Sequence, residues 1–195
     1  MKPWMRMVGS SVMVLLLLGG CAMVAYARWT VPIADGDEAA LAGNAPLAFA
    51  AYAYAEKRFD AAPPLKRLFA SEYERIVANQ LRLLYGFESY DEIIEKAARS
   101  PEGANPHFWA GAACFQKAAL EPDPSVRLAW FTRATEELRR ALEAEPDDWD
   151  TKYNLEMLLR VVWELRRRPQ TPPGELMQLL RPDPASGSAP TKKRG

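Results

Sequence analysis

The sequence predicts an all-α protein in which an N-terminal transmembrane helix is followed by a helical-hairpin domain. Ala, Leu, Glu and Arg dominate the chain, and runs of β-branched residues are scarce beyond the N-terminus, which favours helix. Most of the 16 prolines stand between segments of helical periodicity, where they begin or end helices. Lys plus Arg equals Asp plus Glu at 25 each, so no net charge favours nucleic acid as a partner.

The first element is an apolar stretch, residues 7–27, that contains no charged residue. It is long enough to cross the hydrocarbon core of a bilayer. Lys2 and Arg6 precede it, and positive charge on that side predicts a cytoplasmic N-terminus. We therefore expect a single-pass protein of a bacterial inner membrane, with the domain in the periplasm.

Three fates of this stretch remain open. Residues 1–28 are retained as an anchor in the interpretation that we favour. Alternatively, Ala25-Tyr26-Ala27 has the small-x-small form of a signal peptidase site, so the chain is cleaved after Ala27. In the third, Leu18-Gly19-Gly20-Cys21 resembles a lipobox and Cys21 is lipidated, although Gly19 is unusual there and the following residues stay apolar.

Residues 125–168 predict two helices joined by a short turn. Ser125 is a candidate cap of the first helix, Pro146 ends it, and Asp147 is a candidate cap of the second. Each helix has an apolar stripe at steps of three and four. The stripes are Phe131, Ala134, Leu138, Ala141 and Leu142 in the first helix, and Leu155, Leu158, Leu159 and Val162 in the second.

The spacing of this pair is that of a tetratricopeptide repeat boundary. Ala134, Leu138, Ala141 and Pro146 stand at the offsets of the small, bulky, small and proline positions that close such a repeat. Leu155, nine residues after Pro146, falls where the next repeat places a leucine. An ordinary helical hairpin is the alternative. Either way, the pair is a packing surface, and we expect a tetratricopeptide-like domain at residues 46–168.

Prolines, glycines and capping residues indicate where the remaining segments begin and end. Residues 29–45 read as a juxtamembrane linker with one helical turn near 38–42, and residues 169–195 as a proline-rich, largely disordered tail. Within that tail, residues 174–181 are amphipathic and able to dock back on the domain. Further helices are expected at about 46–59, 64–85 and 90–99, and from Asn105-Pro106 onward with the stripe Phe108, Ala112, Phe115 and Ala119.

Candidate catalytic and metal-binding groups are few. His107 is the one histidine, and a packing or surface role explains it better than catalysis. Cys114, between Ala113 and Phe115, reads as a small buried hydrophobe. The acidic residues near 121–123 and 145–150 are explained by helix capping and lack the spacing of a calcium loop. We therefore expect neither an enzyme nor a resident metal or cofactor.

Aromatic residues are the remaining candidates for a binding surface. We single out four in the central helical pair as partner-binding or repeat-packing residues: Trp130, Trp149, Tyr153 and Trp163. Trp130 and Trp163 lie off the main stripes of their helices. They fill a second layer of the core in the interpretation that we favour, or line a concave groove.

Residues 145–160, and above all Tyr153-Asn154-Leu155-Glu156 after a proline and acidic residues, resemble a segment of MxaK-type proteins. These are accessories encoded with methanol dehydrogenase in methylotrophic bacteria. A similar segment occurs in repeat proteins of Bat-type clusters, which also encode a MoxR ATPase and von Willebrand factor A-like proteins. The N-terminal anchor, the size of the helical domain and the proline-rich end also resemble an MxaK-type protein.

The resemblance implies a tethered factor that assists maturation of a periplasmic quinoprotein methanol dehydrogenase, with a part in calcium insertion. It implies protein partners: the dehydrogenase, von Willebrand factor A-like proteins and a MoxR ATPase system. It carries over no metal-binding residue. The alternative is a general envelope scaffold of a Bat-type cluster, unrelated to methanol oxidation.

Overall fold

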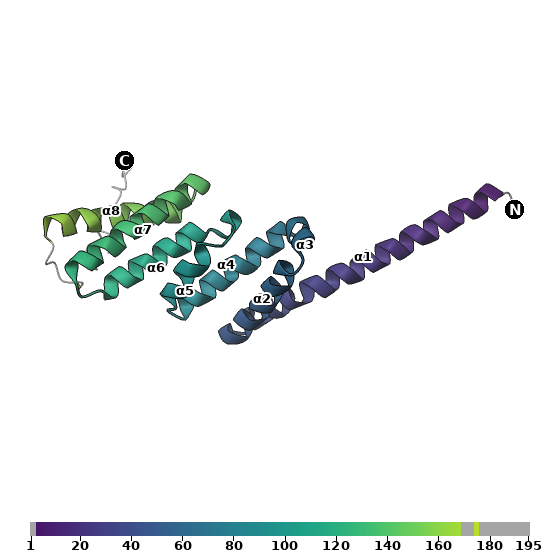
Figure 1. Cartoon of the computed structure of the whole chain (residues 1–195), viewed down its shortest axis with the longest axis horizontal. Coiled ribbons are helices and arrows are strands. Elements are labelled where there is room, and N and C mark those ends of the chain that lie inside the picture. Colours follow the sequence, from purple (N-terminus) through teal and green to yellow (C-terminus); the bar gives the residue numbers. More distant parts are fainter. Residues whose placement is uncertain (1–2, 169–173, 176–195) are drawn as a thin grey trace, which may run out of the picture. The chain divides into compact units, whose positions relative to one another are not determined.

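The computed structural model describes residues 3–168 and 174–175 of the chain, with side chains from Met13 onward. These residues form eight α-helices, one short 3-10 helix and no strand, which confirms the all-α prediction (Figure 1). The helices are α1 (Pro3–Leu41), α2 (Ala45–Asp60), α3 (Pro63–Leu68), α4 (Ala70–Gly86), α5 (Tyr90–Ala97), η1 (Glu102–Ala104), α6 (Pro106–Leu120), α7 (Pro124–Ala144) and α8 (Trp149–Arg167). The tail expected at 169–195 lies outside the described residues apart from Gly174 and Glu175, which are helical.

The helix α1 is long and apolar enough to cross a membrane, by length and composition. Its stretch from Met13 has a mean hydropathy of 1.6. At 1.5 Å per residue, residues 7–27 measure about 30 Å, which matches the hydrocarbon thickness. Large apolar side chains on this stretch are exposed, among them Leu16, Met23 and Val24.

The linker expected at 29–45 is instead mostly helical, because α1 continues without a break to Leu41. Pro32 stands inside the helix, and both Pro32 and Gly36 are buried. Ile33 and Ala39 are also buried, so this part of α1 packs against α2. Tertiary packing against α2 therefore overrides the helix-breaking tendency of proline and glycine.

The chain divides into two compact units between residues 83 and 84, within α4. In the first unit, α2 begins close to the expected position, and the Asn44 side chain accepts from the Leu47 amide at 3.2 Å. Its core contains Tyr52, Phe59, Ile76 and Leu81, each no more than 1% exposed.

The helix expected at 64–85 is broken at Phe69 into α3 and α4. The backbone of Phe69 leaves the helical region, with φ −114° and ψ 47°. Its ring lies 5.6 Å from the ring of Tyr26 on α1. The break therefore coincides with an aromatic contact to α1. The helical periodicity of residues 64–85 gives no indication of it.

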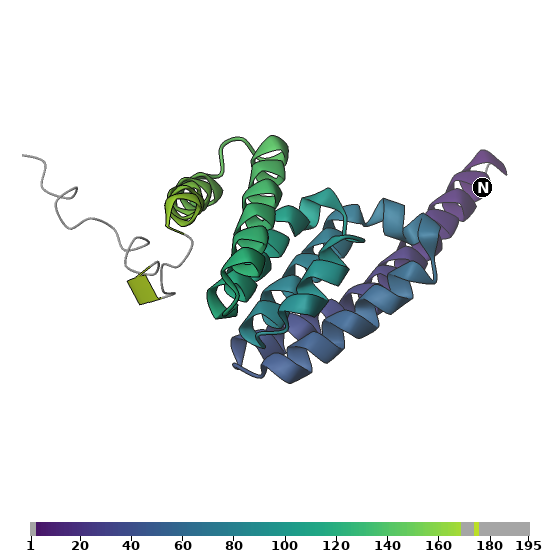
Figure 2. The same cartoon turned by 60° about the vertical axis from the view of Figure 1, so that its left-hand side comes forward.

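In the second unit, α6 and α7 form a helical hairpin and α8 packs against α7, as the two views agree (Figures 1 and 2). The predicted stripe of α7 is confirmed, because Phe131, Ala134, Leu138 and Ala141 are buried. A shared core joins these helices, consisting of Cys114, Ala118, Phe131, Ala134, Leu138, Leu158, Val161, Val162 and Leu165.

The caps of α7 and α8 differ from the expected ones. Asp123, not Ser125, caps α7 by accepting from the amides of residues 125 and 126. Asp148, not Asp147, caps α8 by accepting from the amides of Asp150 and Thr151. Both helices therefore begin close to the expected positions, but a different carboxylate satisfies the free amides of each first turn.

Candidate functional site

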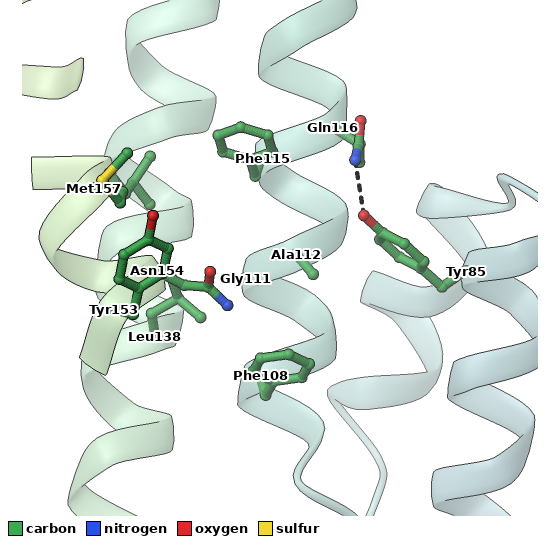
Figure 3. Close-up of a pocket in the computed structure, with 11 residues that line it drawn as sticks. Tyr85, Phe108, Gly111, Ala112, Phe115, Gln116, Leu138, Tyr153, Asn154 and Met157 are labelled. Carbon is green, nitrogen blue, oxygen red and sulfur yellow. Dashed lines mark hydrogen bonds between the residues drawn. The ribbon is translucent and has the colours of Figure 1, made fainter. Parts of the chain in front are cut away.

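A groove between α6 and α8 is a concave site of the second unit (Figure 3). Its cavity volume is about 250 Å³. We call it the α6–α8 groove, and its lining is Tyr85, Phe108, Gly111, Ala112, Phe115, Gln116, Leu138, Tyr153, Asn154, Met157 and Leu158.

One wall of the groove is a face of α6. Phe108, Ala112 and Phe115 follow one another at steps of four and three, so they share this face, as the sequence predicted. Gly111 lies on the same helix where α7 approaches closely. A Cβ added at Gly111 would lie 2.9 Å from Cγ and Cδ2 of Leu138. The absence of a side chain at Gly111 therefore leaves room for Leu138 beside the groove.

The opposite wall comes from the first half of α8. Tyr153 is 50% exposed, whereas Met157 and Leu158 are buried. Tyr153 and Asn154 stand on the α8 side, across the groove from α6 (Figure 3). This wall therefore combines buried apolar groups with an exposed phenol and an exposed amide.

Polar groups of the groove carry no charge. On the α6 side, Gln116 Nε2 donates to the hydroxyl oxygen of Tyr85 at 2.7 Å. The Tyr85 ring is held between the rings of Tyr90 and Trp109, whose centroids are 5.9 and 6.0 Å away. Such a lining suits an uncharged, apolar side chain together with hydrogen bonds to a peptide backbone, rather than an ionic ligand.

Of the four aromatic residues singled out in the sequence, only Tyr153 lines the α6–α8 groove. Trp130 is half-buried against the core, with Lys117 Nζ 4.5 Å from the centre of its ring. Trp149 is 77% exposed. Trp163 is 57% exposed, with the Arg167 guanidinium 4.4 Å from the centre of its ring, so the favoured core role of Trp163 is wrong.

Sequence reasoning missed most of the other groove residues as candidates. Tyr85, Gln116, Asn154 and Met157 belong to three helices, and periodicity assigns residues to a face of one helix only. Gly111 could have indicated the groove from the sequence, because a glycine inside an apolar helix often marks a place where another element packs closely.

The groups considered for chemistry lie outside the groove lining. His107 Nδ1 is 2.8 Å from Glu137 Oε2, which ties α6 to α7. Cys114 is buried as predicted, and burial raises the pKa of its thiol to about 11, so little thiolate is present at neutral pH. Within the described part of the chain, no group of three His, Cys, Asp or Glu side chains is placed to hold a metal ion.

No family model matches the chain, and no curated protein or solved structure matches it.

Proposed function

We propose that this chain is a membrane-tethered scaffold that holds a protein partner in the α6–α8 groove and assists maturation of a periplasmic quinoprotein methanol dehydrogenase. Its partners in this proposal are the dehydrogenase, von Willebrand factor A-like proteins and a MoxR ATPase system. Its action is binding, with no catalysis of its own.

The groove is the observation that carries the binding role. Its volume of about 250 Å³ lies below the roughly 300–1,000 Å³ typical of small-molecule sites. A cavity of that size suits one or two apolar side chains of a protein segment. The exposed Tyr153 and Asn154 side chains offer hydrogen bonds to the backbone of that segment.

The helix α1 supports the tether. The apolar side chains exposed over residues 13–27 would be buried in the hydrocarbon core of a bilayer. Lys2 and Arg6 precede the apolar stretch, so the proposal places the N-terminus in the cytoplasm and both units in the periplasm. In this arrangement the groove faces the compartment that holds periplasmic enzymes.

The resemblance to MxaK-type proteins supports the choice of partner. The segment that carries it, residues 145–160, forms the turn before α8 and the first half of α8. That half contributes Tyr153, Asn154, Met157 and Leu158 to the groove. The segment that suggests the maturation role therefore also supplies one wall of the proposed binding site.

The direct test is a pull-down of the tagged full-length chain from gently solubilised membranes, with partners identified by mass spectrometry. The variant Ala112→Arg places a long charged side chain in the groove, and Ala144→Arg adds the same group at an exposed position at the end of α7. We expect dehydrogenase subunits or von Willebrand factor A-like proteins with the wild type and Ala144→Arg, and their loss with Ala112→Arg. Equal recovery with all three chains would refute the groove as the binding site.

Deletion tests the maturation role. Cells that lack the chain should contain dehydrogenase with reduced activity and reduced calcium content. A dehydrogenase that remains fully active and metal-loaded would refute this role. Recovery of von Willebrand factor A-like and MoxR partners without the dehydrogenase would instead indicate the Bat-type scaffold.

A further inference from the structure

Three segments that contacts bring together at the end of the apolar stretch of α1 carry a cluster of basic and aromatic side chains and one exposed leucine. We call it the collar. It is formed by the end of that stretch, the end of α2 and the short helix α3, and its members are Tyr26, Arg28, Trp29, Lys57, Arg58, Arg67 and Leu68.

The end of α2 is fixed to α1 at Trp29. The rings of Trp29 and Phe59 lie 5.3 Å apart, and the guanidinium carbon of Arg58 lies 4.6 Å from the centre of the Trp29 ring. Arg58 Nη1 also donates to the backbone oxygen of Arg28 at 2.9 Å. These contacts hold the basic end of α2 at the level of residues 28–29.

The helix α3 is held at nearly the same level. Phe69, directly after α3, places its ring 5.6 Å from the ring of Tyr26. Tyr26 is the penultimate residue of the apolar stretch 7–27. If α1 spans the bilayer, as the proposed function requires, α3 therefore lies at the membrane–water interface.

The exposed groups of the collar match that position. Leu68 is 72% exposed, although it is a large apolar residue. Arg28, Lys57 and Arg67 are exposed as well. Asp60, an acidic residue beside them, is paired with Lys66 at 2.8 Å, which offsets its charge. Tyr and Trp side chains are also typical of the interface, where one end of the ring is apolar and the other is wet.

We propose that the collar binds anionic phospholipid headgroups, with Arg28, Lys57, Arg58 and Arg67 facing the phosphates and Leu68 inserted at the acyl boundary. Arginine and lysine at a membrane surface are attracted to anionic lipid, and their alkyl stems cover apolar surface. The contact fixes the height and tilt of the first unit above the bilayer. This inference rests on the proposed membrane tether and adds a second, lipid-specific attachment to it.

The test measures the accessibility of position 68 in the full chain, reconstituted in lipid nanodiscs. In a Cys21→Ser background, with Cys114 buried, the reporters are Leu68→Cys and Leu120→Cys. The two leucines are 72% and 73% exposed, so Leu120 is a matched control. The probe is an uncharged maleimide. Discs of phosphatidylcholine are compared with discs of an equal mixture of phosphatidylcholine and phosphatidylglycerol.

We expect phosphatidylglycerol to slow labelling at position 68 by about tenfold and to leave position 120 unchanged. Charge reversal by Lys57→Glu with Arg67→Glu should abolish the slowing. Reversal at two exposed arginines outside the collar, Arg82→Glu with Arg166→Glu, should preserve it.

Two results would overturn the collar. One is labelling at position 68 that phosphatidylglycerol does not slow. The other is slowing that survives the Lys57→Glu and Arg67→Glu reversal. An alkaline wash of native membranes separates this failure from that of the tether. A chain that washes off refutes the membrane anchor itself, whereas a chain that stays in the membrane without lipid-dependent protection refutes only the collar.

Discussion

The packing of α1 against α2 predicts that Gly36→Ala destabilises the first unit, although alanine is the better helix former. A Cβ added at Gly36 would lie 2.6, 2.8 and 3.0 Å from three ring carbons of Tyr52. Carbon atoms in contact normally lie about 3.5–4.0 Å apart. The Tyr52 ring would therefore have to retreat by about 1 Å. Tyr52 is 1% exposed and donates its hydroxyl to Asp37 Oδ1 at 2.7 Å, so it has little room to move.

The magnitude of the loss follows from two costs and one gain. Overpacking a filled site costs about 1–3 kcal/mol. Loss of the Tyr52 hydrogen bond to Asp37 costs about 1 kcal/mol. The gain from replacing glycine by alanine in a helix is about 1 kcal/mol. The net expectation is a loss of about 1–3 kcal/mol from the stability of the α1–α2 packing.

Native-state hydrogen exchange of the full chain in detergent micelles measures this loss at the α2 amides. The matched control is Gly86→Ala, because Gly86 also stands in a helix but a Cβ there meets nothing within 4 Å. That control should be neutral or stabilising by up to about 1 kcal/mol. If Gly36→Ala slowed hydrogen exchange of the α2 amides, as Gly86→Ala is expected to do for the α4 amides, the packing of residues 28–41 against α2 would be refuted.

Three further predictions concern the second unit. Asp148→Ala should cost about 1 kcal/mol because the cap of α8 is lost, measured as the thermal midpoint against Asp148→Asn, which can still accept from the same amides. Hydrogen bonds, of which the one from the Thr151 side chain has the largest effect, hold the pKa of Asp148 below its usual value. The stability that these bonds contribute is fully present above the unfolded pKa near 4 and is lost as pH falls through the folded pKa. Asp148→Asn should lack this loss of stability in acid. Gly111→Ala should displace Leu138, lower stability by about 0–2 kcal/mol and weaken partner recovery in the pull-down. A gain of about 1 kcal/mol in stability, which is the full helix-propensity effect of alanine, would contradict the close approach of α6 and α7. Cys114 should resist alkylation at pH 8 in the folded chain and react after denaturation, and rapid reaction in the folded chain would contradict its burial.

Periodicity predicted those parts of the fold that one helix determines by itself. Ala134, Leu138 and Ala141 recur at helical spacing and are buried as expected. The apolar N-terminal helix was predicted for the same reason, because length and composition are local properties. The extension of α1 to Leu41 was missed, because Pro32 and Gly36 are helix breakers locally and are accommodated only by the packing on α2.

The candidate site was less predictable, because it is assembled from separate helices. Phe108, Ala112 and Phe115 were recognised as a stripe of one helix, yet the groove also needs α8 and the end of α4. Tyr153 was the one aromatic residue chosen from the sequence that reaches it. Trp163 is of a residue type common in cores, but its side chain is 57% exposed and its ring is contacted by the Arg167 guanidinium rather than enclosed by the core.

Site-specific photo-crosslinking in living cells tests the central claim most directly. The photoreactive residue replaces Phe115 or Tyr153 in the α6–α8 groove, or the exposed Leu120 as a control outside it. We predict adducts with dehydrogenase subunits or von Willebrand factor A-like proteins from the two groove positions, their loss when Ala112→Arg is added, and none from position 120. Absence of adducts at both groove positions, or adducts that Ala112→Arg leaves unchanged, would contradict a scaffold that binds its partner through this groove.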